Sequence, residues 1–184
     1  MTRPHTLLVD MDGVLADFIG GACRVHGRDS QAVLQGWPRG EAHVDAVLGM
    51  TLDVFWRRID AEGTAFWEGL APYPWFGGLL GWLESTGLPW HICSSPSRSP
   101  ASAAGKMAWL YQHVHPRMRD FALTPRKELL ARPGVVLIDD NERFVSRFKA
   151  AGGEALLFPQ PWNHLGAVAD PVGRLRQRLE KLAG

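Results

Sequence analysis

Five short apolar runs alternate with segments of helical periodicity along most of this chain of 184 residues. The apolar runs cover residues 6–9, 88–93, 120–124, 135–138 and 154–158, and helical spacing marks residues 106–114, 141–151 and 172–182. Strands that alternate with helices are typical of βαβ units, whose strands are parallel and covered on both faces. We therefore predict an α/β fold: a Rossmann-like three-layer α/β/α domain with a parallel sheet.

The interval 17–78 interrupts this alternation. It is rich in helix formers and aromatic residues, shows no clear strand, and is punctuated by Gly36-Trp37-Pro38 and Pro72-Tyr73-Pro74. We interpret it as a small helical cap inserted after the first strand. Residues 1–16 and 79–184 then form the α/β core, and residues 17–78 form the cap.

Composition limits the classes of partner. The formal net charge is +1, which gives no electrostatic reason to expect a nucleic acid polymer or an anionic membrane. No apolar stretch approaches the roughly 20 residues of a membrane span, and the N-terminus does not resemble a signal peptide. Cys23 and Cys93 lie far apart without metal-ligand spacing, so we expect reduced thiols and a cytoplasmic protein. The sequence is compatible with a homodimer and does not decide the oligomeric state.

Two carboxylates follow the first apolar run directly. Asp10 and Asp12 are separated by one residue, and Gly13, which allows a sharp turn, comes next. Like charges this close repel each other, and burying both is costly without a cation or a chemical role. Solvated acids at a strand end are the ordinary alternative for this pair taken alone.

Three further groups of polar residues follow the later strands or lie near them. These are Ser94-Ser95-Pro96, a lysine that is either Lys106 or Lys127, and Asp139-Asp140. In an open parallel sheet, ligands bind at the carboxyl ends of the strands. We therefore expect these polar residues, although distant in sequence, to lie close together. Carboxylates suit Mg²⁺, while hydroxyl and ammonium groups bind phosphate oxygens. The residues by themselves thus indicate phosphoryl transfer.

These motifs resemble those of the haloacid dehalogenase-like (HAD) superfamily, and within it the 5'(3')-deoxyribonucleotidases. The similar stretches are VDMDGVLADF at 9–18, ICSSP at 92–96, KMAW at 106–109, LTPRK at 123–127 and LIDD at 137–140. The resemblance implies a Mg²⁺-dependent phosphomonoesterase whose substrates are nucleoside monophosphates, with deoxyribonucleotides first. A HAD phosphatase for another small phosphomonoester is the first alternative, and a binding module without catalysis is the second.

The resemblance also implies roles for individual residues. Asp10 would be the nucleophile that forms an aspartyl-phosphate, and Asp12 the general acid and base. Asp10, the backbone carbonyl of Asp12, and Asp140 would hold the Mg²⁺, with Asp139 in support. The remaining implied contacts to phosphate or substrate come from Ser94, Ser95, Lys127 and Lys106.

The predicted cap departs from the deoxyribonucleotidases. Phe18 matches an aromatic residue that helps shape their base pocket, and Trp37 lies where they have a glycine-aromatic-aromatic stretch, which Pro38 and Arg39 do not fit. Phe18 and Trp37 are therefore candidate substrate contacts, with core packing as the ordinary alternative. The same kind of alternative applies elsewhere, since Ser94-Ser95-Pro96 is also a common turn and both lysines are also ordinary surface residues.

Overall fold

The computed structural model describes residues 3–115 and 119–183. Its single sheet has five parallel strands in the order β3-β2-β1-β4-β5. The strands are β1 (Thr6–Val9), β2 (Trp90–Ser94), β3 (Phe121–Leu123), β4 (Val135–Asp139) and β5 (Glu154–Leu157). All five predicted strands are present, so the predicted parallel α/β sheet is confirmed. Residues 1–2, 116–118 and 184 of the predicted core lie outside the described residues.

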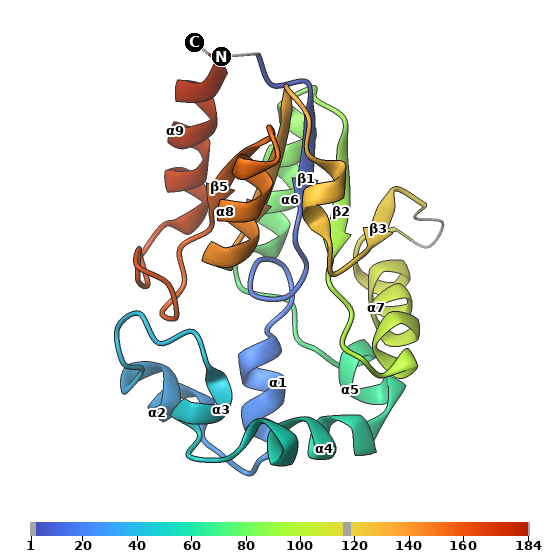
Figure 1. Cartoon of the computed structure of the whole chain (residues 1–184), viewed down its shortest axis with the longest axis vertical. Coiled ribbons are helices and arrows are strands. Elements are labelled where there is room, and N and C mark those ends of the chain that lie inside the picture. The colour runs from blue at the N-terminus through green and yellow to red at the C-terminus, as the bar shows by residue number, and fades with distance from the viewer. Residues whose placement is uncertain (1–2, 116–118, 184) are drawn as a thin grey trace.

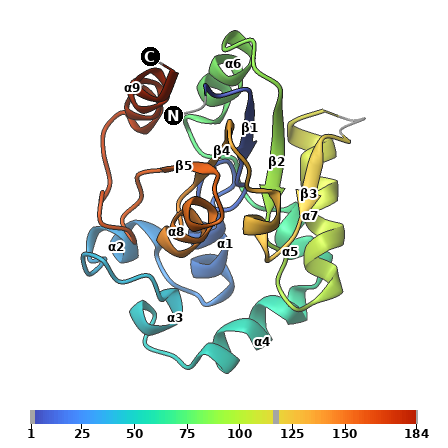
Figure 2. The same cartoon turned by 45° about the horizontal axis from the view of Figure 1, so that its top comes forward.

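Helices cover both faces of the sheet (Figures 1 and 2). The helix α6 (Phe76–Ser85) precedes β2, while α7 (Pro100–His113), α8 (Glu142–Ala150) and α9 (Pro171–Ala183) each follow a strand, and the short 3-10 helix η1 (Lys127–Leu130) follows β3. The predicted helices at 106–114, 141–151 and 172–182 correspond to α7, α8 and α9. The helix α7 begins earlier than predicted, because Pro100 occupies its first turn.

Alternate residues of the central strands belong to two separate hydrophobic clusters. Leu7 and Val9 belong to the larger cluster, which also contains residues of α6, α7 and α9. Leu8 points the opposite way, into a smaller cluster with Leu137 and with Phe148 of α8. Successive side chains of a strand point to opposite faces, so a strand that is apolar at every position must be covered on both sides. This explains why β4 is buried along its whole length.

Six helices separate β1 from β2, and the first five of them lie together below the sheet in Figure 1. They are α1 (Phe18–Val25), α2 (Ser30–Gln35), α3 (Val44–Val47), α4 (Leu52–Glu62) and α5 (Thr64–Glu68). Asp17 caps α1, accepting a hydrogen bond from the backbone N–H of Gly20 at 2.8 Å. The helix α6 begins at Phe76, inside the predicted cap interval 17–78, and runs back beside the sheet. The division into core and cap remains our prediction.

Both cysteines, Cys23 and Cys93, are free and buried. Within residues 3–115 and 119–183, no helix combines the length and the apolar character that crossing a bilayer requires.

Candidate active site

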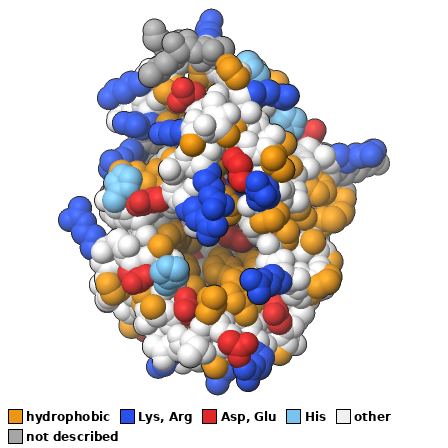
Figure 3. Space-filling view, in the orientation of Figure 1, with side chains coloured by type: hydrophobic (Ala, Val, Ile, Leu, Met, Phe, Trp, Pro, Cys, Tyr) orange, Lys and Arg blue, Asp and Glu red, His pale blue; other side chains and the backbone are white. Residues whose placement is uncertain are grey.

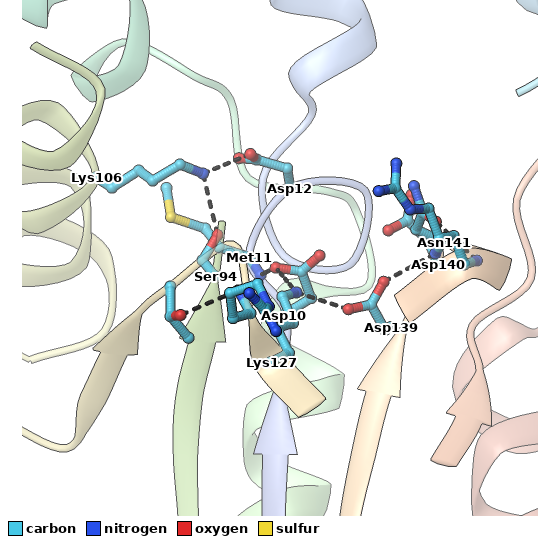
Figure 4. A network of polar contacts seen from close by, with 12 residues as sticks. Asp10, Met11, Asp12, Ser94, Lys106, Lys127, Asp139, Asp140 and Asn141 are labelled. Carbon is cyan, nitrogen blue, oxygen red and sulfur yellow. Dashed lines mark hydrogen bonds and ion pairs between the residues drawn. The ribbon is translucent and has the colours of Figure 1, made fainter. Parts of the chain in front are cut away.

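The polar residues predicted to lie close together are found at the carboxyl end of the sheet. Asp10 follows β1 directly, Ser94 ends β2 and Asp139 ends β4. The strands β2 and β4 flank β1 on its two sides, so the ends of three neighbouring strands face one space (Figure 4). Lys127 enters the same space from the start of η1, after the edge strand β3. The topology alone therefore brings together residues that are distant in sequence.

Lys127 joins two of the carboxylates. Its Nζ atom lies 2.9 Å from Oδ1 of Asp10 and donates to Oδ2 of Asp139 at 2.6 Å. The lysine side chain is fully buried. Burial by itself would lower the pKa of Lys127, but the two carboxylates outweigh it and raise the pKa above its ordinary value. Lys127 is therefore a fixed positive charge behind the reaction space.

Asp10, Asp139 and Asp140 form a compact acidic cluster. Each offers one carboxylate oxygen, these oxygens lie within 4.8 Å of one another, and all three residues are buried. Burial raises the pKa of both Asp139 and Asp140, and repulsion among the three acids adds to the effect on Asp140. Three buried carboxylates around the single ammonium of Lys127 leave excess negative charge. The donor set therefore fits a hard divalent cation.

Asp12 faces a different cation. Its Oδ2 atom accepts a hydrogen bond from Nζ of Lys106, which also donates to Oγ of Ser94 at 3.1 Å. Lys106 is fully buried, and its ammonium lies 4.9 Å from the ring centroid of Trp67. Burial raises the pKa of Asp12, against the influence of Lys106. The second oxygen of Asp12, Oδ1, is buried and has no hydrogen-bond partner among the residues that the structure describes.

Gly13 allows the chain to turn between the two parts of the site. Its φ angle is +74°, in the left-handed region that glycine favours. A Cβ atom at this position would overlap the carboxylate of Asp140. The glycine that follows the acid pair therefore serves both the turn and the close approach of the metal-site carboxylate.

The loop after β5 contributes three residues that the sequence prediction missed. Trp162 donates a hydrogen bond from Nε1 to Oδ2 of Asp140 at 2.5 Å. Asn163 donates from Nδ2 to the backbone oxygen of Asp140 at 2.8 Å, and Gln160 donates to the backbone oxygen of Gly13. The available signal was position alone, because this loop follows the carboxyl end of a fifth parallel strand.

A cavity of about 340 Å³ opens above Asp10 and Asp12. Figure 3 shows a hollow at this level of the molecule, with hydrophobic side chains exposed in it. Both predicted aromatic candidates line the cavity, joined by further rings. The aromatic lining residues are Phe18, Trp37, Trp56, Trp67, Phe144 and Trp162.

These aromatic lining residues form one wall of the cavity, and their rings pack on one another. Phe18 stacks on Trp67, with centroids 5.7 Å apart and planes at 24°, and Trp56 stacks on the same tryptophan with centroids 6.5 Å apart. Helical spacing in the sequence suits a core as well as a pocket, so it could not select Trp56 and Trp67 as pocket residues. Ser95 lines the cavity as well, whereas Ser94 is fully buried beneath it.

Residues 3–169 match the model of a protein family described as "5' nucleotidase, deoxy (Pyrimidine), cytosolic type C protein". The chain belongs to this family. It is 30% identical over 166 residues to the cytosolic-type 5'(3')-deoxyribonucleotidase of Homo sapiens, covering 86% of this chain and 81% of the human protein. The predicted resemblance and the predicted enzyme class, a nucleotidase-type phosphoric monoester hydrolase, are confirmed.

Solved structures support the fold. A HAD-superfamily hydrolase of subfamily IA from Geobacter sulfurreducens aligns with a TM-score of 0.58 at 13% identity, over 100% of this chain and 98% of that one. A HAD family hydrolase from Deinococcus radiodurans, with bound phosphate and sodium, aligns with a TM-score of 0.52 at 18% identity, over 95% and 89%. At these identities the likeness concerns the fold alone.

Proposed function

We propose that the protein is a Mg²⁺-dependent phosphomonoesterase that hydrolyses nucleoside monophosphates through an aspartyl-phosphate on Asp10. One observation carries the proposal. Asp10 and Asp12 lie side by side in the floor of one cavity, yet each is bound to its own lysine, Lys127 and Lys106. Two neighbouring carboxylates in different environments suit two different tasks.

In the first step, a carboxylate oxygen of Asp10 attacks the phosphorus of the substrate. The ester bond between phosphorus and the leaving oxygen breaks, and Asp12 gives its proton to that oxygen. The raised pKa of Asp12 favours the protonated form that this step needs. Within the described part of the chain its Oδ1 atom has no hydrogen-bond partner, and we assign the proton to this oxygen.

In the second step, Asp12 removes a proton from a water molecule, whose oxygen attacks the phosphorus of the aspartyl-phosphate. The bond between phosphorus and Asp10 breaks, which releases inorganic phosphate and restores both acids. Lys106 holds Asp12 in place during both transfers. Lys106 also donates to Ser94, so we assign it to orienting these two side chains, and its implied contact to phosphate stays a prediction.

We propose Asp10, Asp140 and the backbone carbonyl of Asp12 as the residues that hold Mg²⁺. Asp139 supports them, since its carboxylate already accepts from Lys127 at 2.6 Å and from the backbone N–H of Asn141 at 2.9 Å. When bound, Mg²⁺ supplies positive charge that offsets the repulsion between Asp10 and the phosphate. Ser95 and Lys127 provide further donors for the phosphate oxygens.

The aromatic wall supports a nucleoside as the leaving group. Flat rings bind a base by stacking, which contributes about 1–3 kcal/mol per base. The human relative is named a 5'(3')-deoxyribonucleotidase, so deoxyribonucleoside monophosphates are our first candidates. Both Phe18 and Trp37 line the cavity over Asp10, which favours nucleotides over another small phosphomonoester.

A screen of phosphate release tests this proposal. Purified protein is assayed with Mg²⁺ against deoxyribo- and ribonucleoside monophosphates, sugar phosphates and 4-nitrophenyl phosphate, with a chelator and Asp10→Asn as controls. The proposal predicts the highest kcat/KM for a deoxyribonucleoside monophosphate and no turnover in either control. A preference for a sugar phosphate would support the alternative phosphatase, and no release from any monophosphate would support a binding module.

We also propose a cytosolic location. The human relative is of the cytosolic type, and the two buried cysteines are unpaired, as expected in a reducing compartment. Cell fractionation followed by detection of the native protein tests this location.

A further inference from the structure

Trp162 lies on the strand side of the cavity and touches the acidic cluster. Its indole N–H donates to Oδ2 of Asp140 at 2.5 Å, and the half-buried side chain lines the cavity. The next residue, Asn163, is almost fully buried and ties the loop to the backbone oxygens of Asp140 and Phe158, at 2.8 and 2.9 Å. The indole is therefore held firmly against one carboxylate oxygen of Asp140.

The same indole also contacts the segment between α2 and α3. Its ring packs against Trp37, with centroids 5.6 Å apart and planes at 56°. Trp37 is itself fixed within its segment, because its Nε1 donates to the backbone oxygen of Glu41 at 2.7 Å. Trp162 thus joins the acidic cluster to the predicted cap across the edge of the cavity.

We propose that Trp162 is a positioning residue that couples cation binding at the acidic cluster to the seating of the Trp37 segment over the cavity. The proposal rests on the Mg²⁺ site proposed above. The hydrogen bond to Oδ2 fixes the orientation of the Asp140 carboxylate, which belongs to the cluster with Asp10 and Asp139. If the two regions are coupled, removing the contact between the two tryptophans is expected to weaken cation binding, although the indole N–H of Trp37 donates to the backbone of Glu41 and not to the acidic cluster.

Binding of Mn²⁺ alone, without substrate, tests the coupling. Mn²⁺ has an electron paramagnetic resonance signal that is lost on binding, so its Kd can be measured for the whole protein. Trp162→Phe keeps a ring but removes the N–H, and we expect about 10-fold weaker binding, the lower end of what loss of a ligand-orienting hydrogen bond costs. Trp37→Leu keeps that hydrogen bond but removes the ring contact, and we expect a smaller loss, about 3-fold.

The double variant and a matched control complete the experiment. Residues that act through one contact are not additive, so Trp162→Phe combined with Trp37→Leu is expected to lose less than the product of the two single losses. Trp82→Phe, in α6 and outside the cavity lining, is expected to bind Mn²⁺ as the unchanged protein does. In activity assays, raising the Mg²⁺ concentration should restore kcat of Trp162→Phe, and urea unfolding without metal should match the unchanged protein, which separates weaker cation binding from a general loss of folding.

Each result decides one part of the proposal. Equal Mn²⁺ affinity of Trp162→Phe and the unchanged protein would overturn the positioning role, while hydrolysis could proceed as proposed. Two results would overturn the coupling. One is weaker Mn²⁺ binding by Trp162→Phe with unchanged binding by Trp37→Leu. The other is a loss of Mn²⁺ affinity in the double variant equal to the product of the two single losses. Absence of Mn²⁺ binding by the unchanged protein would overturn the proposed metal site and this inference together.

Discussion

The floor and the wall of the cavity are built in different ways. On the floor, buried charges are paired at fixed distances: Lys127 lies between Asp10 and Asp139, and Lys106 binds Asp12. On the wall, rings pack on rings, and most of the contacts are non-directional. A paired buried charge cannot be replaced singly without leaving its partner uncompensated, whereas an aromatic wall tolerates exchange of one ring for another. The chemistry is therefore expected to depend on the floor and the choice of substrate on the wall.

The largest expected effect is on the floor. Asp10→Asn removes the nucleophile but keeps the size of the side chain, so kcat should fall by about 10⁴-fold or more while the far-UV circular dichroism spectrum stays unchanged. Phosphate release measured with a nucleoside monophosphate checks this. Turnover near the original rate would remove Asp10 from its role and break the assignment of chemistry to the floor.

Asp12→Asn should separate proton transfer from nucleophilic attack. General acid catalysis contributes about 10²–10⁴-fold, and it matters most when the leaving oxygen is a poor leaving group. We expect a large loss of kcat for nucleoside monophosphates and a much smaller loss for 4-nitrophenyl phosphate, whose leaving group needs no proton. Equal losses for both esters in parallel assays would contradict the acid role.

Lys127→Met should reveal what the charge pairing on the floor contributes to stability. Removing one partner of a buried ion pair costs about 3–5 kcal/mol, and here Asp10 and Asp139 both lose their cation. Urea unfolding without metal measures the loss, and added Mg²⁺ should recover part of it. The matched control is Lys149→Met in α8, an exposed lysine, for which a change below about 0.5 kcal/mol is expected.

The wall should respond in substrate affinity instead. Trp56→Ala removes a half-buried ring that stacks on Trp67 and lines the cavity, so KM for nucleoside monophosphates should rise about 10-fold. KM for 4-nitrophenyl phosphate and kcat for both substrates should change little. A fall in kcat of similar size would show that the wall also positions the reacting groups, and the comparison would no longer hold.

The smallest effect concerns the packing behind the wall. His26 is buried and stacks on Phe55, with centroids 5.3 Å apart, and burial, together with Arg58 and Arg28, lowers its pKa below the ordinary value of 6.5. The unfolded chain therefore binds a proton more readily than the folded protein. The stability that neutral His26 contributes is present above pH 6.5 and is lost as the pH falls toward the lowered pKa.

His26→Phe should therefore flatten the decline of stability below pH 6.5. Thermal unfolding at a series of pH values measures this, with His43→Gln as the control, since His43 is exposed. An unchanged decline in His26→Phe would assign the pH dependence to other groups.

The elements that the sequence predicted best are those whose own residue pattern indicates whether they are buried. The apolar run of β4 is buried on both sides and was found from the sequence within one residue of its end. Strand-end acids such as Asp10 and Asp139 were also predictable in position, because parallel strands end at one edge of the sheet. The start of α7 was missed, although Pro100 is a common first-turn residue.

Other features depend on partners that no local pattern reveals. Trp162 belongs to an irregular loop, and its role depends on Asp140, which directly follows β4. Likewise, Lys106 shows the periodicity of a surface lysine, yet it is fully buried because Asp12 and Ser94 supply its hydrogen-bond partners. Hydrophobic periodicity describes burial along one element, and it carries no information on which distant atom completes a hydrogen bond.

The position of β1 at the centre of the sheet has a consequence for how the protein folds. Its two neighbours, β2 and β4, come from Trp90–Ser94 and Val135–Asp139, so β1 can pair on either side only with segments far along the chain. Closing such long loops before any pairing is gained slows folding and leaves apolar strands exposed meanwhile. We therefore expect β1, which leads directly into the proposed nucleophile, to be ordered late. A chain arrested before β4 would expose an unpaired, aggregation-prone strand edge and would lack the acids that follow β4 in the site.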